Sequence, residues 1–209
     1  HIEYLKEREP TKAHLVLTAL ERAGMLPQFV NQNHDGLALK ACFPMAKLNE
    51  IHGSWFDHRN PVVTMEGSMR KDLLDRLDHW TETADLVLSL GTSLSGLYAD
   101  SLCTGVATRA STSPSSQDGL GLVIVSLTRT PLDDIAALRI YATIDEVMEM
   151  LCTRLKLEPY LPGKREVKQA SKRSSLFRVY ARWYRDVYDV SKYRRETKAM
   201  VRARAQPSR

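Results

Sequence analysis

The chain has 209 residues, of which 43% are hydrophobic, and it carries a formal net charge of +5. This length accommodates one ordinary domain with an appendage, or two very small domains, and the apolar share excludes wholesale disorder. No stretch approaches the 18 or more apolar residues of a membrane-spanning helix, and the start of the chain lacks the charged-then-apolar pattern of a signal peptide.

The charge is unevenly distributed along the chain. Residues 1–157 contain 15 Lys and Arg against 20 Asp and Glu, which gives a net charge of −5. Residues 158–209 contain 15 Lys and Arg against 5 Asp and Glu, which gives +10. This contrast predicts two parts with separate roles, a globular domain over residues 1–157 and a basic tail over residues 158–209.

The cysteines are few and far apart. Cys42, Cys103 and Cys152 are odd in number and form neither a disulfide framework nor a Cys-x-x-Cys metal motif. We therefore expect free thiols, mostly in the core, and a reducing intracellular compartment, with nucleus, cytoplasm and organelle left open.

The first predicted elements are a helix and a short strand. Residues 11–24 favour a helix because Thr11 is a plausible start, apolar residues recur at helical spacing, and Gly24 provides a stop. Residues 28–30 favour a strand that runs into the polar loop 31–36. Ligands of open α/β sheets bind in the crevice at the carboxyl ends of the strands, which is where this loop would lie.

The following elements alternate in type. We expect a helix over 71–80, strands over 85–90, 122–125 and 138–140, a Ser- and Thr-rich loop over 108–119, and a helix that Asp145 begins as its cap and that continues to Leu155. Strands and helices that alternate at these lengths predict an α/β fold with a mostly parallel, Rossmann-like sheet.

The tail differs in composition from the rest of the chain. Beyond Pro159, apolar and aromatic residues such as Leu176, Tyr180, Trp183 and Val187 recur every three or four residues, and Arg and Lys fill the other faces. The pattern predicts a basic amphipathic helical extension. Three roles remain open for it: docking on a protein partner of a larger complex, binding nucleic acid or another acidic surface, or an ordinary solvated helix.

Several motifs in order resemble one family. They are Asn31-Gln32-Asn33-His34-Asp35-Gly36, Glu50-Ile51-His52-Gly53, Gly91-Thr92-Ser93-Leu94, and the closing segments 123–133, 137–140 and 145–148. Together they resemble the sirtuin family, whose members use NAD and an acyl-lysine substrate. The resemblance covers most of residues 1–157 and implies the large, Rossmann-like sirtuin domain.

The resemblance also implies roles for individual residues. His52 would be the general base on the ribose hydroxyls, a role suited to a residue type that titrates near neutrality. Asn33, the second catalytic residue, and Asp35 would hold the carboxamide of nicotinamide, and Gln32 would bind the ribose hydroxyls. The remaining cofactor-binding candidates follow two later strands: they are Gly91, Thr92, Ser93 and Ser126.

The sequence departs from the family pattern in four places. No cysteine lies between His52 and the helix at residue 71, so we expect no zinc and an absent or reduced zinc lobe. His34 stands in place of an aliphatic residue, and Ser126 stands in place of an Asn. The Gly-Ala-Gly phosphate loop and the first strand are not in these residues, and we expect them upstream of His1.

Two functions follow as hypotheses. One is an NAD-dependent protein-lysine deacylase, or a related enzyme that transfers ADP-ribose, centred on His52 and Asn33. The alternative is a pseudoenzyme, a catalytically inactive sirtuin-fold subunit of a larger intracellular assembly, which docks through the tail of residues 158–209.

Overall fold

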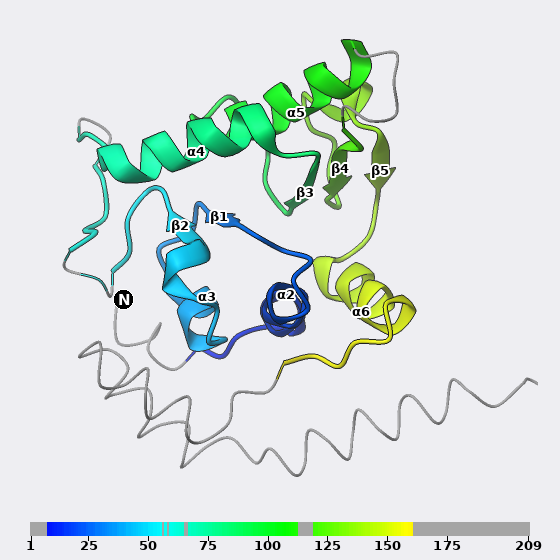
Figure 1. Cartoon of the computed structure of the whole chain (residues 1–209), viewed down its shortest axis with the longest axis horizontal. Helices are drawn as coiled ribbons and strands as arrows, with labels where there is room; N and C mark the ends of the chain where they lie inside the picture. Colours follow the sequence, from blue (N-terminus) through cyan, green and yellow to red (C-terminus); the bar gives the residue numbers. More distant parts are fainter. Residues whose placement is uncertain (1–7, 56, 58, 65–66, 113–118, 161–209) are drawn as a thin grey trace, which may run out of the picture. The chain divides into compact units, whose positions relative to one another are not determined.

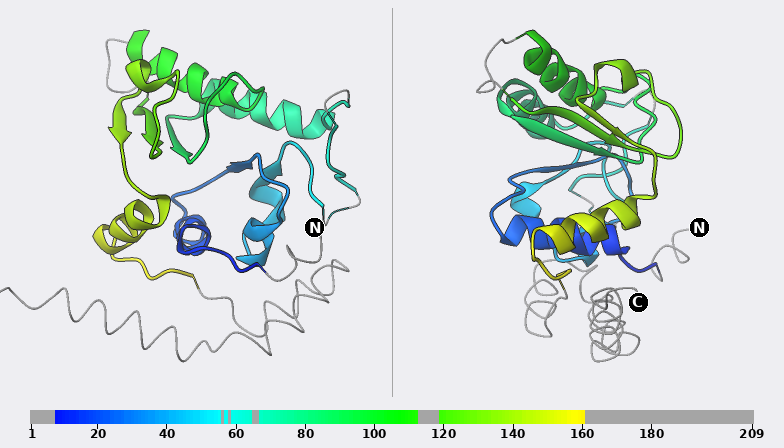
Figure 2. Two further views of the ribbon diagram at one scale, coloured as in Figure 1. Left: turned by 180° about the vertical axis from the view of Figure 1, so that it is seen from behind. Right: turned by 90° about the vertical axis from the view of Figure 1, so that its right-hand side faces the viewer.

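A computed structural model describes residues 8–55, 57, 59–64, 67–112 and 119–160. The tail predicted over 158–209 lies outside the described residues from residue 161 onward. The described residues form three layers, with α4 and α5 on one side of the strands and α2 and α6 on the other (Figures 1 and 2). None of the helices described is long and apolar enough to cross a membrane.

Helices and strands alternate along the described chain. In order they are α2 (Lys12–Arg22), β1 (Phe29–Asn31), α3 (Leu37–Lys40), the 3-10 turn η1 (Met45–Lys47), β2 (Leu48–Glu50), α4 (Lys71–Thr83), β3 (Leu86–Leu90), α5 (Asp100–Thr112), β4 (Gly121–Val125), the 3-10 turn η2 (Asp133–Ile135), β5 (Leu138–Ile140) and α6 (Ile144–Arg154). The fold is α/β with parallel strand pairing, as the alternation predicts.

The strands fall into two hydrogen-bonded sheets. β1 pairs in parallel with β2, and the second sheet has the order β3-β4-β5, also parallel throughout. The two sheets rest on one layer of helices, because Phe29 of β1 and Leu88 and Leu90 of β3 pack against the same apolar cluster of α2 and α6. The candidate site residues follow β1, β2, β3 and β4, and each of these strands pairs in parallel with its neighbour.

The apolar core lies on both sides of the strands. α5 packs on one face of the second sheet through Cys103, Val106 and Ala107, which contact Val87 and Ile124 among others. Burial on both faces explains why residues 122–125 form a continuous apolar run rather than an alternating one. Cys103 and Cys152 are buried free thiols, and Cys42 is partly buried.

The start of α6 differs from the prediction. Thr143, not Asp145, is the N-cap, and its hydroxyl accepts a hydrogen bond from the backbone N–H of Glu146. Asp145 instead reaches across to α2, where its Oδ1 accepts from the backbone N–H of Ala13 at 2.9 Å. The prediction that Asp145 caps this helix was therefore wrong, because its carboxylate satisfies an open N–H group in the first turn of a neighbouring helix.

The loop predicted over residues 108–119 is also wrong in its first half. α5 continues to Thr112, and residues 113–118 lie outside the described residues. Arg109 fixes this end of α5 by donating to the backbone carbonyls of Thr81 and Ala84. The hydroxyls of Ser111 and Thr112 bond back to the carbonyl of Thr108, which satisfies them inside the helix.

Candidate functional site

The loops that follow β1 and β2 meet at the carboxyl edge of the first sheet. Nδ1 of His34 lies 2.9 Å from the carbonyl oxygen of Gly53, and the rings of His34 and His52 are 6.4 Å apart between centroids. A carbonyl can only accept, so Nδ1 of His34 carries the proton in this contact. The ring of His34 thereby stands beside the predicted catalytic histidine.

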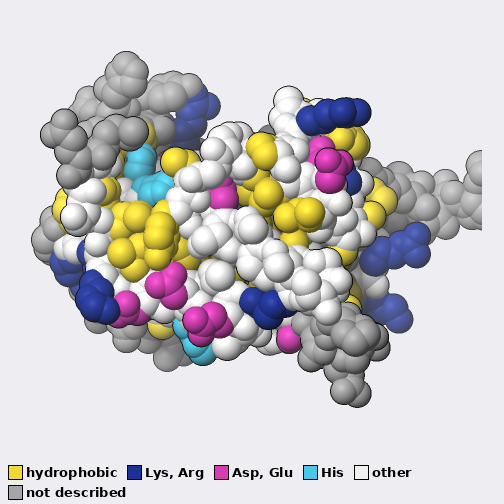
Figure 3. Space-filling view, turned by 90° about the horizontal axis from the view of Figure 1, so that it is seen from above, with side chains coloured by type: hydrophobic (Ala, Val, Ile, Leu, Met, Phe, Trp, Pro, Cys, Tyr) yellow, Lys and Arg dark blue, Asp and Glu magenta, His cyan; other side chains and the backbone are white. Residues whose placement is uncertain are grey.

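A third ring extends this pair. The backbone N–H of Trp55 donates to the carbonyl of His34 at 3.1 Å, and the two rings are 5.3 Å apart between centroids. The three rings of His52, His34 and Trp55 therefore follow one another. Figure 3 shows histidine side chains at the surface of one face of the molecule. Trp55 was not among the predicted site residues.

Short-range contacts hold both loops in place. The side chain of Asn31 accepts from the backbone N–H of Asn33, and Asp35 accepts from the backbone N–H of Leu37 at the start of α3. Gly53 has a φ of +82°, and a Cβ at this position would lie 2.1 Å from the backbone oxygen of Pro61. Asx-type bonds and a glycine in a left-handed conformation thus shape the two loops.

Asp100 connects the first loop to α5. The side-chain amide of Gln32 donates to Asp100 Oδ1 at 3.3 Å. The other oxygen of Asp100 accepts from the backbone N–H groups of Gly96 and Leu97, each at 2.9 Å. Asp100 is buried, and sequence reasoning missed it. An acid that follows a glycine-containing turn before an apolar segment was the signal that could have found it.

The remaining predicted residues form a second group at the ends of β3 and β4. The backbone N–H of Gly91 donates to the carbonyl of Val125, directly before Ser126, and the hydroxyl of Thr92 accepts weakly from the backbone N–H of Leu94 at 3.4 Å. Among the described contacts, none joins Gly91, Thr92, Ser93 or Ser126 directly to Gln32, Asn33, Asp35 or His52. The link between the groups is the bond of Gln32 to Asp100 in α5, the helix that follows residues 91–93.

Two buried polar atoms close to these loops have no partner in the structure. They are Nδ2 of Asn31, beside Gln32, and Oγ of Ser101, beside Asp100. Buried donors without partners are uncommon in folded proteins, and each calls for a water or a ligand group. Asn31 and Ser101 are next in sequence to Gln32 and Asp100, the two residues whose side chains join the loop after β1 to α5.

Glu50 ends β2, two residues before His52, and it was not predicted as a site residue. Its burial, followed by the negative charges of Asp35 and Asp57, raises its pKa from 4.5 to about 7. Glu50 lines a cavity of about 300 Å³, whereas none of the predicted site residues lines it. Among the described residues, no group of three or more His, Cys, Asp or Glu side chains could hold a metal ion.

Known proteins with a similar sequence are NAD-dependent deacetylases. No protein-family model matches the chain. The NAD-dependent protein deacetylase SRT1 of Oryza sativa subsp. indica is 28% identical, over 83% of this chain and 42% of the plant protein. The NAD-dependent protein deacetylase sirtuin-7 of Mus musculus is 30% identical, over 74% of this chain and 47% of the mouse protein.

Solved structures agree on the fold. The structure of Sir2Tm bound to a propionylated peptide has a TM-score of 0.63 and 23% identity, over 74% of this chain and 75% of that chain. The chain carries a sirtuin-family domain. The resemblance in the motifs is confirmed at the level of the family. A Sir2 homologue in complex with 2'-O-acetyl ADP ribose has a TM-score of 0.64 and 25% identity, over 74% of this chain and 70% of that chain.

The sirtuin-family domain represents only part of these relatives. The chain spans less than half the length of the plant and mouse deacetylases. The individual roles of Gln32, Asn33, Asp35, His52 and the residues of the second group stay predictions.

Proposed function

We propose that this sirtuin-family domain binds NAD and is the nucleotide-binding part of an NAD-dependent protein-lysine deacylase. The observation that carries the proposal is the meeting of the loops after β1 and β2, where His34 bonds to Gly53 and its ring lies 6.4 Å from that of His52. NAD would supply the ribose carbon that carries nicotinamide, toward which the acyl-lysine reacts.

The chain's own residues would bind and move a proton. His52 would accept a proton at its imidazole from a ribose hydroxyl, and Asn33 would hold the carboxamide through its exposed side chain. Gln32 would bind the ribose while its bond to Asp100 fixes its position. The neighbouring unpartnered Nδ2 of Asn31 could donate to the same ligand.

The structure fits the two halves of NAD unequally. The nicotinamide-ribose half has the polar side chains described above. For the pyrophosphate, the N–H of Gly91 already donates to the carbonyl of Val125, and the described residues contain no Gly-Ala-Gly loop after a strand. We therefore expect weak NAD binding by residues 1–209 alone, measured by calorimetry.

The test measures nicotinamide released from NAD in the presence of acetylated or propionylated lysine peptides. Replacement of His52 with Ala should reduce release by at least about 100-fold, the usual contribution of a general base, and leave NAD affinity nearly unchanged. His79→Ala is the matched control, because His79 is an exposed histidine on α4. Full turnover by His52→Ala, or NAD binding without nicotinamide release in the presence of either peptide, would end the proposal.

A second candidate is an inactive subunit of a larger intracellular assembly. The feature that favours it is the composition of residues 158–209, which hold 15 Lys and Arg against 5 Asp and Glu. The partner would bind the basic tail of residues 158–209, whose aromatic and Arg side chains are typical of binding hot spots. Co-purification of a complex that is lost on deletion of 158–209 would support this candidate, and an unchanged monomer in gel filtration would contradict it.

A further inference from the structure

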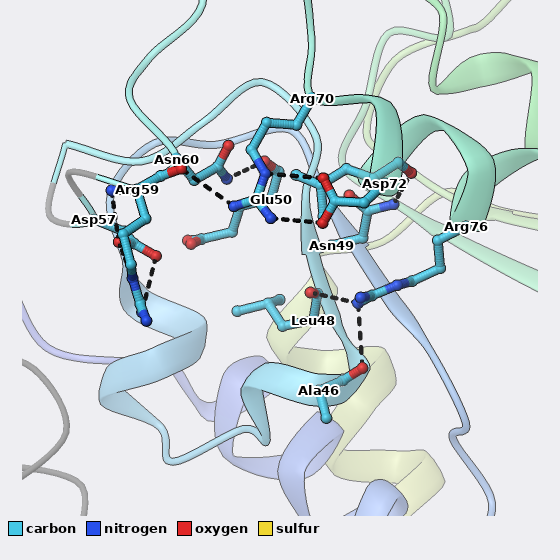
Figure 4. A network of polar contacts seen from close by, with 11 residues as sticks. Ala46, Leu48, Asn49, Glu50, Asp57, Arg59, Asn60, Arg70, Asp72 and Arg76 are labelled. Atoms are coloured by element: carbon cyan, nitrogen blue, oxygen red, sulfur yellow. Dashed lines mark hydrogen bonds and ion pairs between the residues drawn. The ribbon is translucent and has the colours of Figure 1, made fainter.

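A cavity of about 300 Å³ opens beside β2, at the strand edge that does not pair with β1. Its walls come from α3, η1, β2, the segment before α4, and α4 itself (Figure 4). The apolar part of the wall consists of Leu39, Met45, Leu48 and Leu73. The volume is at the lower end of the range for small-molecule sites.

One wall of the cavity carries a buried acceptor without a donor. Glu50 is 6% exposed and lines the cavity, and its Oε1 has no hydrogen-bond partner. Its backbone is well held, since the side-chain amide of Asn60 donates to its carbonyl at 2.9 Å. A fixed, buried carboxyl oxygen without a donor costs free energy, and an N–H or O–H group of a ligand in the cavity would remove that cost.

Two of the three arginines in the wall are already neutralised. Arg59 donates to Asp57, with Nε at 3.1 Å, and Arg70 donates to Asp72, with Nε at 3.0 Å. Nη1 of Arg70 also donates to the carbonyl of Arg59 at 3.3 Å, so all three nitrogens of Arg70 are engaged. These two ion pairs leave little net charge for a ligand.

Arg76 is the remaining donor. Its Nη1 donates to the carbonyls of Ala46 and Leu48, at 3.2 and 3.3 Å. Among the described contacts, Nε and Nη2 of Arg76 have no partner. The cavity therefore presents one open acceptor, Glu50, one group with open donors, Arg76, and an apolar wall between four elements.

We propose that this cavity binds a small, electrically neutral ligand whose amide-type group donates an N–H to Glu50 and accepts from Arg76, with a short apolar stem against Leu48 and Leu73. An ammonium ligand would satisfy Glu50 but offer no acceptor to Arg76, the one guanidinium in the wall that has no acid partner among the described contacts. A carboxylate ligand would satisfy Arg76 but, above about pH 7 where Glu50 is ionised, would place a second anion beside it. A neutral group with both functions meets neither conflict. This site is separate from the proposed NAD site and does not depend on catalysis.

The test uses three probes with the same stem: isobutyramide, isobutylamine and isobutyrate. Each is titrated into the isotope-labelled protein, and backbone and methyl signals are followed by NMR. We expect isobutyramide to shift the signals of Leu39, Leu48 and Leu73 with a millimolar Kd, and to bind at least ten times more tightly than the amine or the acid. Tighter binding of the amine or the acid, or no saturable shift by the amide, would overturn the proposal.

Substitutions in the cavity wall show where isobutyramide binds. Glu50→Leu and Arg76→Met should each weaken isobutyramide binding at least tenfold, whereas Arg129→Met, at an exposed position, should not. Met45→Trp fills the cavity from its exposed rim and blocks binding even if Glu50→Leu fails to fold. Asn33→Ala should leave amide binding unchanged. Loss of binding in Asn33→Ala but not in Met45→Trp would assign the amide to the NAD site and overturn the proposal.

Discussion

Replacing Glu50 with Gln should change how the stability of the domain depends on pH. Burial favours the protonated carboxyl, so the folded protein keeps this proton up to about pH 7, whereas the unfolded chain loses it near 4.5. Between these two values the unfolded state binds fewer protons than the folded state. The free energy of unfolding therefore falls as the pH rises through this window and stays reduced above it.

The size of the effect follows from the two pKa values. A displacement from 4.5 to about 7 corresponds to about 3 kcal/mol of lost stability above the window, at about 1.4 kcal/mol per pKa unit. Gln cannot ionise and keeps nearly the same shape, so the variant lacks this loss. Relative to the parent, Glu50→Gln should gain roughly 2–3 kcal/mol in unfolding free energy between about pH 5 and pH 8.

Urea denaturation at several pH values measures this difference, with Glu82→Gln on the exposed side of α4 as the matched control. The control should show no comparable change with pH. If the difference between Glu50→Gln and the parent stays constant across the window, the carboxyl does not hold its proton and the reasoning about its burial is refuted.

Three further changes test the packing of the domain by chemical denaturation. Met148→Ala, at a side chain with 0% exposure, should lower the free energy of unfolding by about 2–5 kcal/mol. Met150→Ala, at 62% exposure on the same helix, should lower it by less than about 0.5 kcal/mol. Equal losses would contradict the assigned core. Gly53→Ala should cost more than about 3 kcal/mol, because its Cβ would overlap a backbone oxygen 2.1 Å away, whereas Gly96→Ala meets nothing within 4 Å and should cost only the left-handed strain of about 1–2 kcal/mol. Thr143→Ala should lose about 1 kcal/mol through the missing N-cap hydroxyl, and an unchanged unfolding midpoint would rule out that cap.

The sequence predicted the elements whose patterns are local and strong. The helix at α2 and the strands β3, β4 and β5 appear within one or two residues of the predicted bounds, because each combines an apolar pattern with clear start and stop residues. α4 runs three residues past its predicted end at Trp80. The family resemblance assigned Gln32, Asn33 and His52 to one site, and the loops at residues 31–36 and 51–55 do meet in the structure.

Other features depend on partners that are distant in sequence. β2 was not predicted, because Leu48-Asn49-Glu50 is polar for a strand and is held by pairing with β1 and by the bond of Asn49 to the carbonyl of Leu73. The roles of Asp100 and Glu50 were missed for the same reason. From a single sequence, an acidic residue is expected at the surface. Only the fold shows that Asp100 accepts a hydrogen bond from Gln32 and that Glu50 is buried.

The bond between Asp145 and the start of α2 bears on the order in which the domain forms during synthesis. The two residues it joins, Ala13 and Asp145, are 132 positions apart, and Lys12 and Glu149 add an ion pair between the same two helices. Closing so long a loop is slow, and a nascent chain meets this requirement late. During synthesis α2 therefore leaves the ribosome before α6, and its apolar side stays uncovered until α6 is made. Chaperone binding to the nascent chain is best sought in that interval.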